Sequence, residues 1–324
     1  MNRIYFNKEI DKFIVDIYVI GYEKKGESIY IRIKTLEGDY LKDILIDCYA
    51  TDYNRSMELL GELKKDEEYI NYICVSHYHD DHIKQMEDII KKYSKENTVI
   101  LYPDTDQPLS LTDLANNVRA CIAEQRINGR RLYGNLKKIA DPTDNIMSEE
   151  LIYNTQEINI QLKAISPYSN ITTVNVKKNP QDIEQNDYSI ALLLTIGQIK
   201  MLFTSDIMNN TINLTDKQGE ILYIKIPHHG SKESDKIFEK IDLTKNTVCV
   251  CTNYKSSHLP NNEILDKYNS KTEKVYITDG EGTDDFGIIN TRYLIDVKDG
   301  SIRYSTRCMN NSKKYEKENY LVSL

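Results

Sequence analysis

The histidines of this chain are confined to three short polar segments at the ends of apolar runs. All six lie in segments 77–82 (His-Tyr-His-Asp-Asp-His), 227–231 (Pro-His-His-Gly-Ser) and 257–260 (Ser-His-Leu-Pro). The runs that precede the first two segments, residues 69–76 and 221–226, read as buried strands. A fold that fits this pattern gathers several strand ends around one polar centre. Neutral imidazoles beside carboxylates are typical metal ligands, so the pattern predicts a metal site.

The other apolar runs predict two series of short strands with helices between them. The first series covers residues 13–20, 29–33, 44–47, 69–76 and 99–102. The second covers residues 157–166, 188–196, 199–204, 221–226, 247–251, 275–278, 293–297 and 302–305. Helices are expected at about 54–65, 82–93 and 110–127. We therefore predict one domain of the α/β class, a two-sheet sandwich whose chemistry lies in loops at one edge.

The composition is that of a globular protein. The chain has 324 residues, of which 40% are hydrophobic and 28% are charged. No apolar run reaches the ~18 residues of a membrane span, and the N-terminus is too charged for a secretory signal. We therefore expect a cytoplasmic protein without a membrane partner. The net charge of −8 argues against a generic polyanion-binding surface but permits a local basic lip.

The first histidine segment has the spacing H-x-H-x-D-H. His77 and His79 are separated by one residue at a strand end, so their side chains point the same way and can hold one ion together. Asp81 and His82, on the following turn, are expected to face a second ion. Two metals about 3.5–4 Å apart can share a bridging hydroxide and clamp a scissile group from both sides.

Such a site needs further ligands from distant parts of the sequence. Asp206 follows the strand at 199–204 and is well placed to bridge the two metals. His229 is a candidate to complete the second metal site, although the sequence alone leaves the roles of His228 and His229 open. Asp47 ends the short strand at 44–47 and carries another carboxylate toward the same region.

With these residues the chain resembles the metallo-β-lactamase superfamily, whose hallmark is H-x-H-x-D-H. It is most similar to the hydrolase domain of ComEC-type DNA-uptake proteins and their free-standing relatives. The similar motifs are Gly26-Glu27-Ser28, residues 186–192, Thr204-Ser205-Asp206, Pro227 to Ser231, residues 257–260 and residues 278–282. The order of motifs holds from about residue 13 to 305. Residues 104–180 do not match and are interpreted as a helical, basic insertion within a hydrolase domain at 1–308, before a polar tail at 309–324.

The resemblance implies the four-layer αββα metallo-β-lactamase sandwich and a metal-dependent hydrolase with two divalent ions. Zinc is the first expectation, and manganese or iron also suits mixed nitrogen and oxygen ligation. The implied ligands are His77 and His79 for one ion, and Asp81, His82 and His229 for the other, with Asp206 between them. In many enzymes of this fold, another histidine completes the first metal site. This chain has none there, and Asn186 or Asp187 is the nearest candidate.

The resemblance also suggests roles for the remaining polar residues. Asp81 can serve as a ligand or as a base. His228 and His258 can contact a substrate phosphate or protonate a leaving group. A structural role for His258 in its turn is the alternative. Asp47 is expected to orient a ligand histidine rather than to bind metal itself.

The substrate is not named by the fold, because this fold hydrolyses lactams, thioesters, lactones and phosphodiesters. The ComEC-like branch favours a phosphodiester, with nucleic acid as the suspected substrate, so we predict a phosphodiesterase or nuclease. The basic segment 126–138, with Arg126, Arg130 and Arg131, can form a phosphate-binding lip or a solvated helix end. The alternatives are a thioester or lactone hydrolase, and a module of a multi-protein complex, such as a defence assembly, that docks through residues 104–180.

Overall fold

The structure is a computed structural model and carries no bound ligand. It describes residues 2–5, 12–38, 40–64, 69–104, 111–124, 126–127, 130–131, 135–153, 156–171, 184–279, 284–296 and 300–316. All structural statements below refer to these residues.

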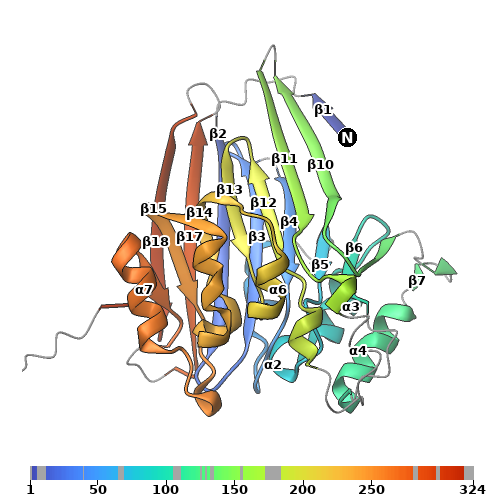
Figure 1. The fold of residues 1–324 in the computed structure, drawn as a ribbon. Coiled ribbons are helices and arrows are strands. Elements are labelled where there is room, and N and C mark those ends of the chain that lie inside the picture. The colour runs from blue at the N-terminus through green and yellow to red at the C-terminus, as the bar shows by residue number, and fades with distance from the viewer. Residues whose placement is uncertain are drawn as a thin grey trace, which may run out of the picture.

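Two large mixed sheets form the body of the molecule (Figure 1). The nine-stranded sheet has the order β1 (Asn2–Tyr5), β10 (Thr143–Tyr153), β11 (Gln156–Ala164), β12 (Leu192–Ile196), β13 (Ile199–Phe203), β14 (Gly219–Lys225), β15 (Ile241–Cys251), β16 (Val275–Ile277) and β19 (Lys313–Lys314). The eight-stranded sheet has the order β18 (Ile302–Asn310), β17 (Phe286–Asp296), β2 (Lys12–Tyr22), β3 (Glu27–Thr35), β4 (Tyr40–Ile46), β5 (Tyr72–Cys74), β6 (Val99–Pro103) and β9 (Leu136–Ile139). The predicted two-sheet α/β architecture is confirmed at this level.

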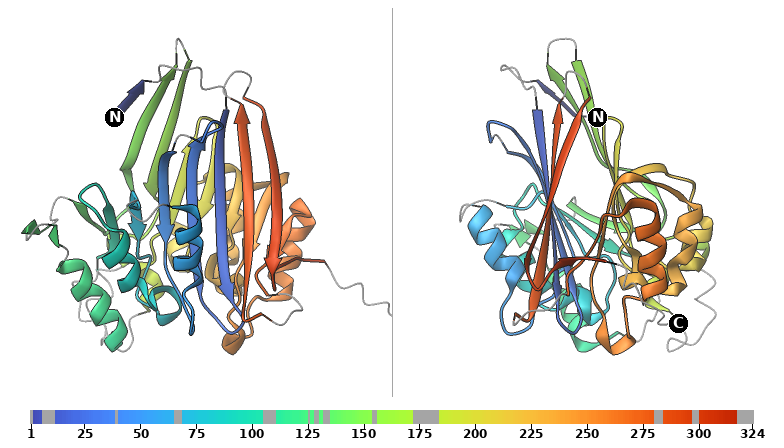
Figure 2. Two further views of the ribbon diagram at one scale, coloured as in Figure 1. Left: turned by 180° about the vertical axis from the view of Figure 1, so that it is seen from behind. Right: turned by 90° about the vertical axis from the view of Figure 1, so that its left-hand side faces the viewer.

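Helices cover the outer face of each sheet, as the side view in Figure 2 shows. The eight-stranded sheet carries α1 (Arg55–Leu63), α2 (Asp80–Ile83), α3 (Met86–Tyr93) and α4 (Asp113–Ala123). The nine-stranded sheet carries α6 (Asn209–Leu214), α7 (Asn262–Thr272) and the 3-10 segment η5 (Lys232–Glu239). None of the helices in the described ranges has the length and apolar character needed to cross a membrane.

The main core lies between the two sheets, and strand alternation explains how it forms. In β4, Ile44 and Ile46 face the other sheet, while Leu45 between them packs under the helices. In β2, Val15 and Ile17 face the same inter-sheet core. Successive side chains of a strand point to opposite faces, so each apolar strand contributes to two cores at once.

The polar centre forms because several strand ends meet at one edge of the sandwich. Strand β4 runs parallel to β5, and β13, β14 and β15 run parallel to one another. Strand β3 is antiparallel to β4, so its first residue, Glu27, lies at the same edge as the last residues of β4. This edge is at the bottom in Figure 1.

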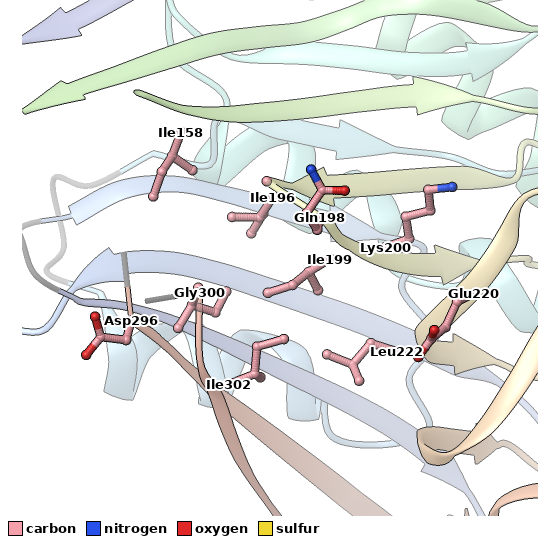
Figure 3. Close-up of a pocket in the computed structure, with 12 residues that line it drawn as sticks. Ile158, Ile196, Gln198, Ile199, Lys200, Glu220, Leu222, Asp296, Gly300 and Ile302 are labelled. Carbon is pink, nitrogen blue, oxygen red and sulfur yellow. The ribbon is translucent and has the colours of Figure 1, made fainter. Parts of the chain in front are cut away.

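The opposite edge has a different character. An apolar cavity of about 420 Å³ lies there between the sheets, with Ile196, Ile199, Leu222 and Ile302 in its walls (Figure 3). The hairpin turn at Gly197 belongs to this edge. No histidine takes part in its lining, which separates this cavity from the histidine segments.

The structure refines three predicted elements. The helix expected at 82–93 is divided into α2 and α3, because Gln85 adopts a left-handed conformation with φ of 71° between them. The segment 104–180 contributes β9, β10 and β11 to the sheets as well as α4. The predicted tail at 309–324 begins too early, because residues 309–310 complete β18; residues 313–314 form edge strand β19, and residues 317–324 lie outside the described ranges.

Candidate metal centre

Five strands deliver the polar side chains of the centre. Asp47 follows β4 with a φ of 59°, and His77 and His79 follow β5. Asp206 comes just after β13. The two histidines of η4 (Pro227–Gly230) follow β14, and Thr252 follows β15. Parallel strands thus bring residues that are more than 150 positions apart in the sequence to one edge.

The first half-site consists of His77, His79 and Asp206. The His77 Nε2 and His79 Nδ1 atoms are 3.1 Å apart, and His77 Nε2 is 4.0 Å from Asp206 Oδ2. His77 is fully buried, whereas His79 is only partly buried. Two ring nitrogens at this separation can direct their lone pairs at a single ion.

The second half-site consists of Asp81, His82, Asp206 and His229. The Asp206 Oδ2 atom lies 3.4 Å from His82 Nε2 and 3.5 Å from His229 Nε2. The Asp81 Oδ2 atom lies 3.3 Å from His229 Nε2 and 3.7 Å from His82 Nε2. Because Asp206 also approaches His77, its carboxylate is shared by the two half-sites.

The donor atoms of this cluster lack ordinary partners. His82 Nε2, His229 Nε2 and Asp206 Oδ1 are buried, and none of them has a hydrogen-bond partner among the described residues. Leaving a buried polar group unpaired costs about 1–3 kcal/mol, so three converging groups of this kind are unfavourable in an empty site. A divalent ion would satisfy all three, and imidazole and carboxylate groups are suitable ligands for it. The residues present therefore fit a bound metal.

His82 is held from behind by Asp47. The His82 Nδ1 atom is 2.8 Å from Asp47 Oδ2, so the ring offers Nε2 to the cluster. Asp47 is itself fixed, because Oδ1 accepts the Ser76 N–H at 2.7 Å and Oδ2 accepts the Ser76 hydroxyl at 2.6 Å. Asp47 thus contacts a candidate ligand through the ring nitrogen that is not the one nearest Asp206.

His77 is held by two hydroxyl groups. Since the Ser76 hydroxyl donates to Asp47, its oxygen is left to accept from Ser205 at 2.6 Å and from His77 Nδ1 at 3.0 Å. His77 therefore carries its proton on Nδ1 and turns the Nε2 lone pair toward His79. The rings of His77 and His82 are therefore both held at Nδ1, and both present Nε2 to the centre.

His229 is held by a longer buried chain. Its Nδ1 atom is 2.9 Å from the Thr252 hydroxyl, which donates to Glu27 Oε2 at 2.7 Å. The Lys225 ammonium lies 2.5 Å from the same Glu27 oxygen. All four side chains are fully buried.

The electrostatics of the cluster favour a positive charge at its centre. Burial lowers the pKa of the His77 imidazole well below its usual value, so this ring is neutral. Burial also opposes a charged His82, but the carboxylates of Asp206, Asp47 and Asp81 outweigh it and raise the His82 pKa well above its usual value. The carboxylates therefore stabilise a cation at this position, and a metal ion can supply that charge in place of a proton.

The two histidines of η4 take different positions in the structure. Both have positive φ angles, 47° for His228 and 49° for His229, and only His229 turns into the cluster. His228 is partly exposed, and its Nε2 lies 3.4 Å from the Asn186 side-chain nitrogen. Asn186 thus lies beside His228, and Asp187 is buried on the same turn but is not a member of the histidine–carboxylate groups around Asp206.

The other predicted site residues lie further away. His258 is exposed on the turn after η6 (Lys255–Ser257), and no contact in the described ranges joins its side chain to the cluster. That turn does pack beside η4, because Asn261 N–H donates to the Gly230 carbonyl at 3.2 Å. Arg126, Arg130 and Arg131 lie in the small ribbon of β7 (Arg126–Ile127) and β8 (Arg130–Arg131), and their side chains lie outside the described part of the chain.

Glu27 and Thr252 were not predicted as site residues. Two sequence signals pointed to Glu27: its place in the motif Gly26-Glu27-Ser28, and Lys225, a charged residue inside the apolar run at 221–226. A lysine in a buried strand requires a buried acidic partner. Neither signal shows that the two residues pair with each other, because they are almost 200 positions apart.

A scan against protein-family models found no match to this chain, and a search of curated proteins found none either. The interpretation of the centre therefore depends on its geometry and chemistry.

Proposed function

We propose that this protein is a metal-dependent hydrolase of the metallo-β-lactamase superfamily, with the αββα arrangement of that family, and that it cleaves phosphodiesters. The observation that carries the proposal is the convergence of His82 Nε2, His229 Nε2 and Asp206 Oδ1, all buried and unpaired. The shared position of Asp206 between the half-sites supports two ions rather than one. Imidazole-rich ligation favours zinc, with manganese or iron as the other candidates.

The division of labour follows from the contacts. When bound, two divalent ions would activate water and neutralise the negative charge that develops on a phosphoryl group. Asp206 would hold both ions, and Asp81 would bind on the side of His229. His228 lies next to the cluster with its Nε2 facing the Asn186 amide, which leaves Nδ1 to carry a proton. This Nδ1 atom is buried without a hydrogen-bond partner among the described residues, and a leaving-group oxygen that reached it would take up the proton.

Two lysines beside the cluster support an anionic substrate. The Lys25 ammonium lies 5.8 Å from the ring centre of Tyr254, and the Lys84 ammonium lies 5.5 Å from that of Tyr49. Among the described residues, no ion pair joins Lys25 or Lys84 to a carboxylate. The Tyr254 ring is 5.5 Å from the ring of His229.

Tyr49 lies on the same side of the centre. Burial and the nearby carboxylate of Asp81 raise the pKa of this tyrosine. Lysines next to aromatic rings suit a polyanion with bases, such as single-stranded nucleic acid. A neutral thioester or lactone would make no use of these two charges, which is why we favour the phosphodiester.

The test is a substrate and metal panel. Protein stripped of metal would be reloaded with zinc, manganese or iron and offered a minimal aryl phosphodiester, single- and double-stranded DNA, RNA, a thioester and a lactone. We expect metal-dependent cleavage of phosphodiesters that chelation removes. Turnover of the carbon esters alone would replace this proposal with the thioester or lactone alternative. Absence of metal binding would overturn it altogether.

A further inference from the structure

A buried ion pair lies directly behind the second half-site. Lys225 is in the last position of β14 and Glu27 is in the first position of β3, and both side chains are inaccessible to solvent. Their charged atoms are 2.5 Å apart, and the ammonium also donates to the Ile226 carbonyl at 3.1 Å. Removing two charges from water is costly, and such a pair adds little to stability compared with apolar residues of the same size.

The ion pair fixes the direction of the hydrogen bonds that lead to His229. A carboxylate can only accept hydrogen bonds, so the Thr252 hydroxyl at 2.7 Å has to donate to Glu27. Its oxygen then has only lone pairs to offer to His229 Nδ1 at 2.9 Å. The proton of the neutral imidazole is therefore on Nδ1, and the Nε2 lone pair faces Asp206 and Asp81.

Glu27 lies close to His82, Asp206 and His229 and approaches the Nδ1 side of both rings. Its Oε2 is 3.8 Å from His229 Nδ1, and its Oε1 is 3.9 Å from His82 Nδ1. It thus lies behind both rings, on the side opposite the Nε2 atoms that meet at Asp206. One carboxylate placed there attracts the Nδ1 protons of both histidines at once.

We propose that Lys225, Glu27 and Thr252 form a positioning relay that sets the tautomer and orientation of His229 and thereby the metal affinity of the second half-site. The relay rests on the proposed metal-binding function. Lys225 keeps Glu27 charged, Glu27 accepts a hydrogen bond from the Thr252 hydroxyl, and the Thr252 oxygen accepts one from His229 Nδ1–H. No member of the relay touches the substrate.

The decisive variants change Thr252. Replacement of Thr252 by Val keeps the shape of the side chain and removes the acceptor for His229 Nδ1, whereas Thr252→Ser keeps the hydroxyl. Partners behind a metal ligand typically contribute about 10–100-fold to metal affinity. We expect Thr252→Val to weaken binding in the second half-site by that factor and Thr252→Ser to remain close to the wild type. Calorimetric titration of metal-free protein with zinc would measure both.

Thr247→Val is the matched control. Thr247 is also fully buried, precedes Thr252 by five positions, and its hydroxyl donates to the Ile221 carbonyl at 2.7 Å, remote from the cluster. It should carry a similar folding cost with unchanged metal affinity. A Glu27→Gln/Lys225→Met double variant removes both charges together, so that neither is left buried without a partner, and it should weaken zinc binding as Thr252→Val does.

A spectroscopic readout separates positioning from general loosening of the fold. Nitrogen NMR of histidine side chains in metal-free protein should show His229 protonated on Nδ1 in the wild type and in Thr252→Ser. In Thr252→Val this preference should be lost while circular dichroism stays native. If the wild type binds zinc and Thr252→Val retains both its affinity and its tautomer, the relay is wrong. If the wild type binds no metal, the proposed function itself fails.

Discussion

The two half-sites of the candidate metal centre differ in how firmly the fold holds their imidazoles. In the second half-site, His82 is anchored by the Asp47 carboxylate, and His229 by Thr252 and the charge of Glu27. In the first, His77 is anchored only by hydroxyl groups. His79 is partly exposed, and within the described ranges its one hydrogen-bonding neighbour is His77.

This difference implies unequal metal affinities. Ligands whose rotamers and tautomers are fixed in advance lose less freedom when a metal binds. The second half-site also has the Asp81 carboxylate in addition to the shared Asp206, whereas the first has no third imidazole within the chain. We therefore expect the second half-site to fill first and the first half-site to bind an exchangeable ion.

Removal of the shared carboxylate should have the largest effect. Asp206→Asn takes the negative charge from both half-sites, so both ions should be lost and phosphodiester cleavage should fall by about a thousandfold or more, equivalent to ~4 kcal/mol of barrier. Metal analysis and single-turnover cleavage would measure this. If Asp206→Asn kept two ions, the shared role of this residue would be wrong.

Loss of a ligand from the first half-site should empty that half-site and leave the second one filled. His79→Ala is expected to release one ion, to abolish cleavage that needs two ions, and to leave the second half-site occupied. Metal content after dialysis should fall from two ions to one per chain. Loss of both ions would show that the half-sites do not bind independently.

Weakening one anchor should reverse the order of affinities without removing a ligand. Asp47→Asn takes away the anionic partner of His82, and we expect the affinity of the second half-site to fall by about 10–100-fold. Competition with a chelator would follow the change. An unchanged affinity of the tighter ion in Asp47→Asn would contradict the comparison.

The smallest expected effect concerns the substrate side of the second half-site. Lys25→Ala/Lys84→Ala should raise KM for single-stranded DNA without altering turnover of a minimal diester. Loss of two phosphate contacts should reduce the slope of log affinity against log salt by about 1.4 for a single strand. Lys92→Ala is a matched control, because Lys92 lies 5.1 Å from the Tyr93 ring on α3, in a similar cation–aromatic pair. An identical salt slope in the double variant and the control would remove the lysines from substrate binding.

The sequence was informative wherever chemistry is local. The H-x-H-x-D-H spacing and the polar ends of apolar runs predicted which strands meet at one edge, because alternation and parallel pairing follow simple geometry. The break of the helix at Gln85 was not predictable, since nothing in the residue type requires a left-handed conformation there. The choice between His228 and His229 was equally inaccessible, because it depends on two consecutive positive φ angles in η4.

The sequence also did not predict which distant residues contact the histidine ligands. Glu27 contributes to the centre only because β3 runs antiparallel to β4 and brings its first residue to the edge where the other strands end. The charge of the basic segment at 126–138 predicted a phosphate-binding lip there. The lysines beside the cluster are instead Lys25 and Lys84, and no sequence pattern marks either of them. Tertiary pairing, rather than local composition, selects these residues.

The most direct test is a calorimetric titration of the metal-free wild-type protein with zinc. The proposal predicts two ions per chain that bind in two unequal steps, with Asp47→Asn weakening only the tighter step. Absence of binding, or a single step that Asp47→Asn leaves unchanged, would contradict the assignment of this cluster as an asymmetric two-metal centre.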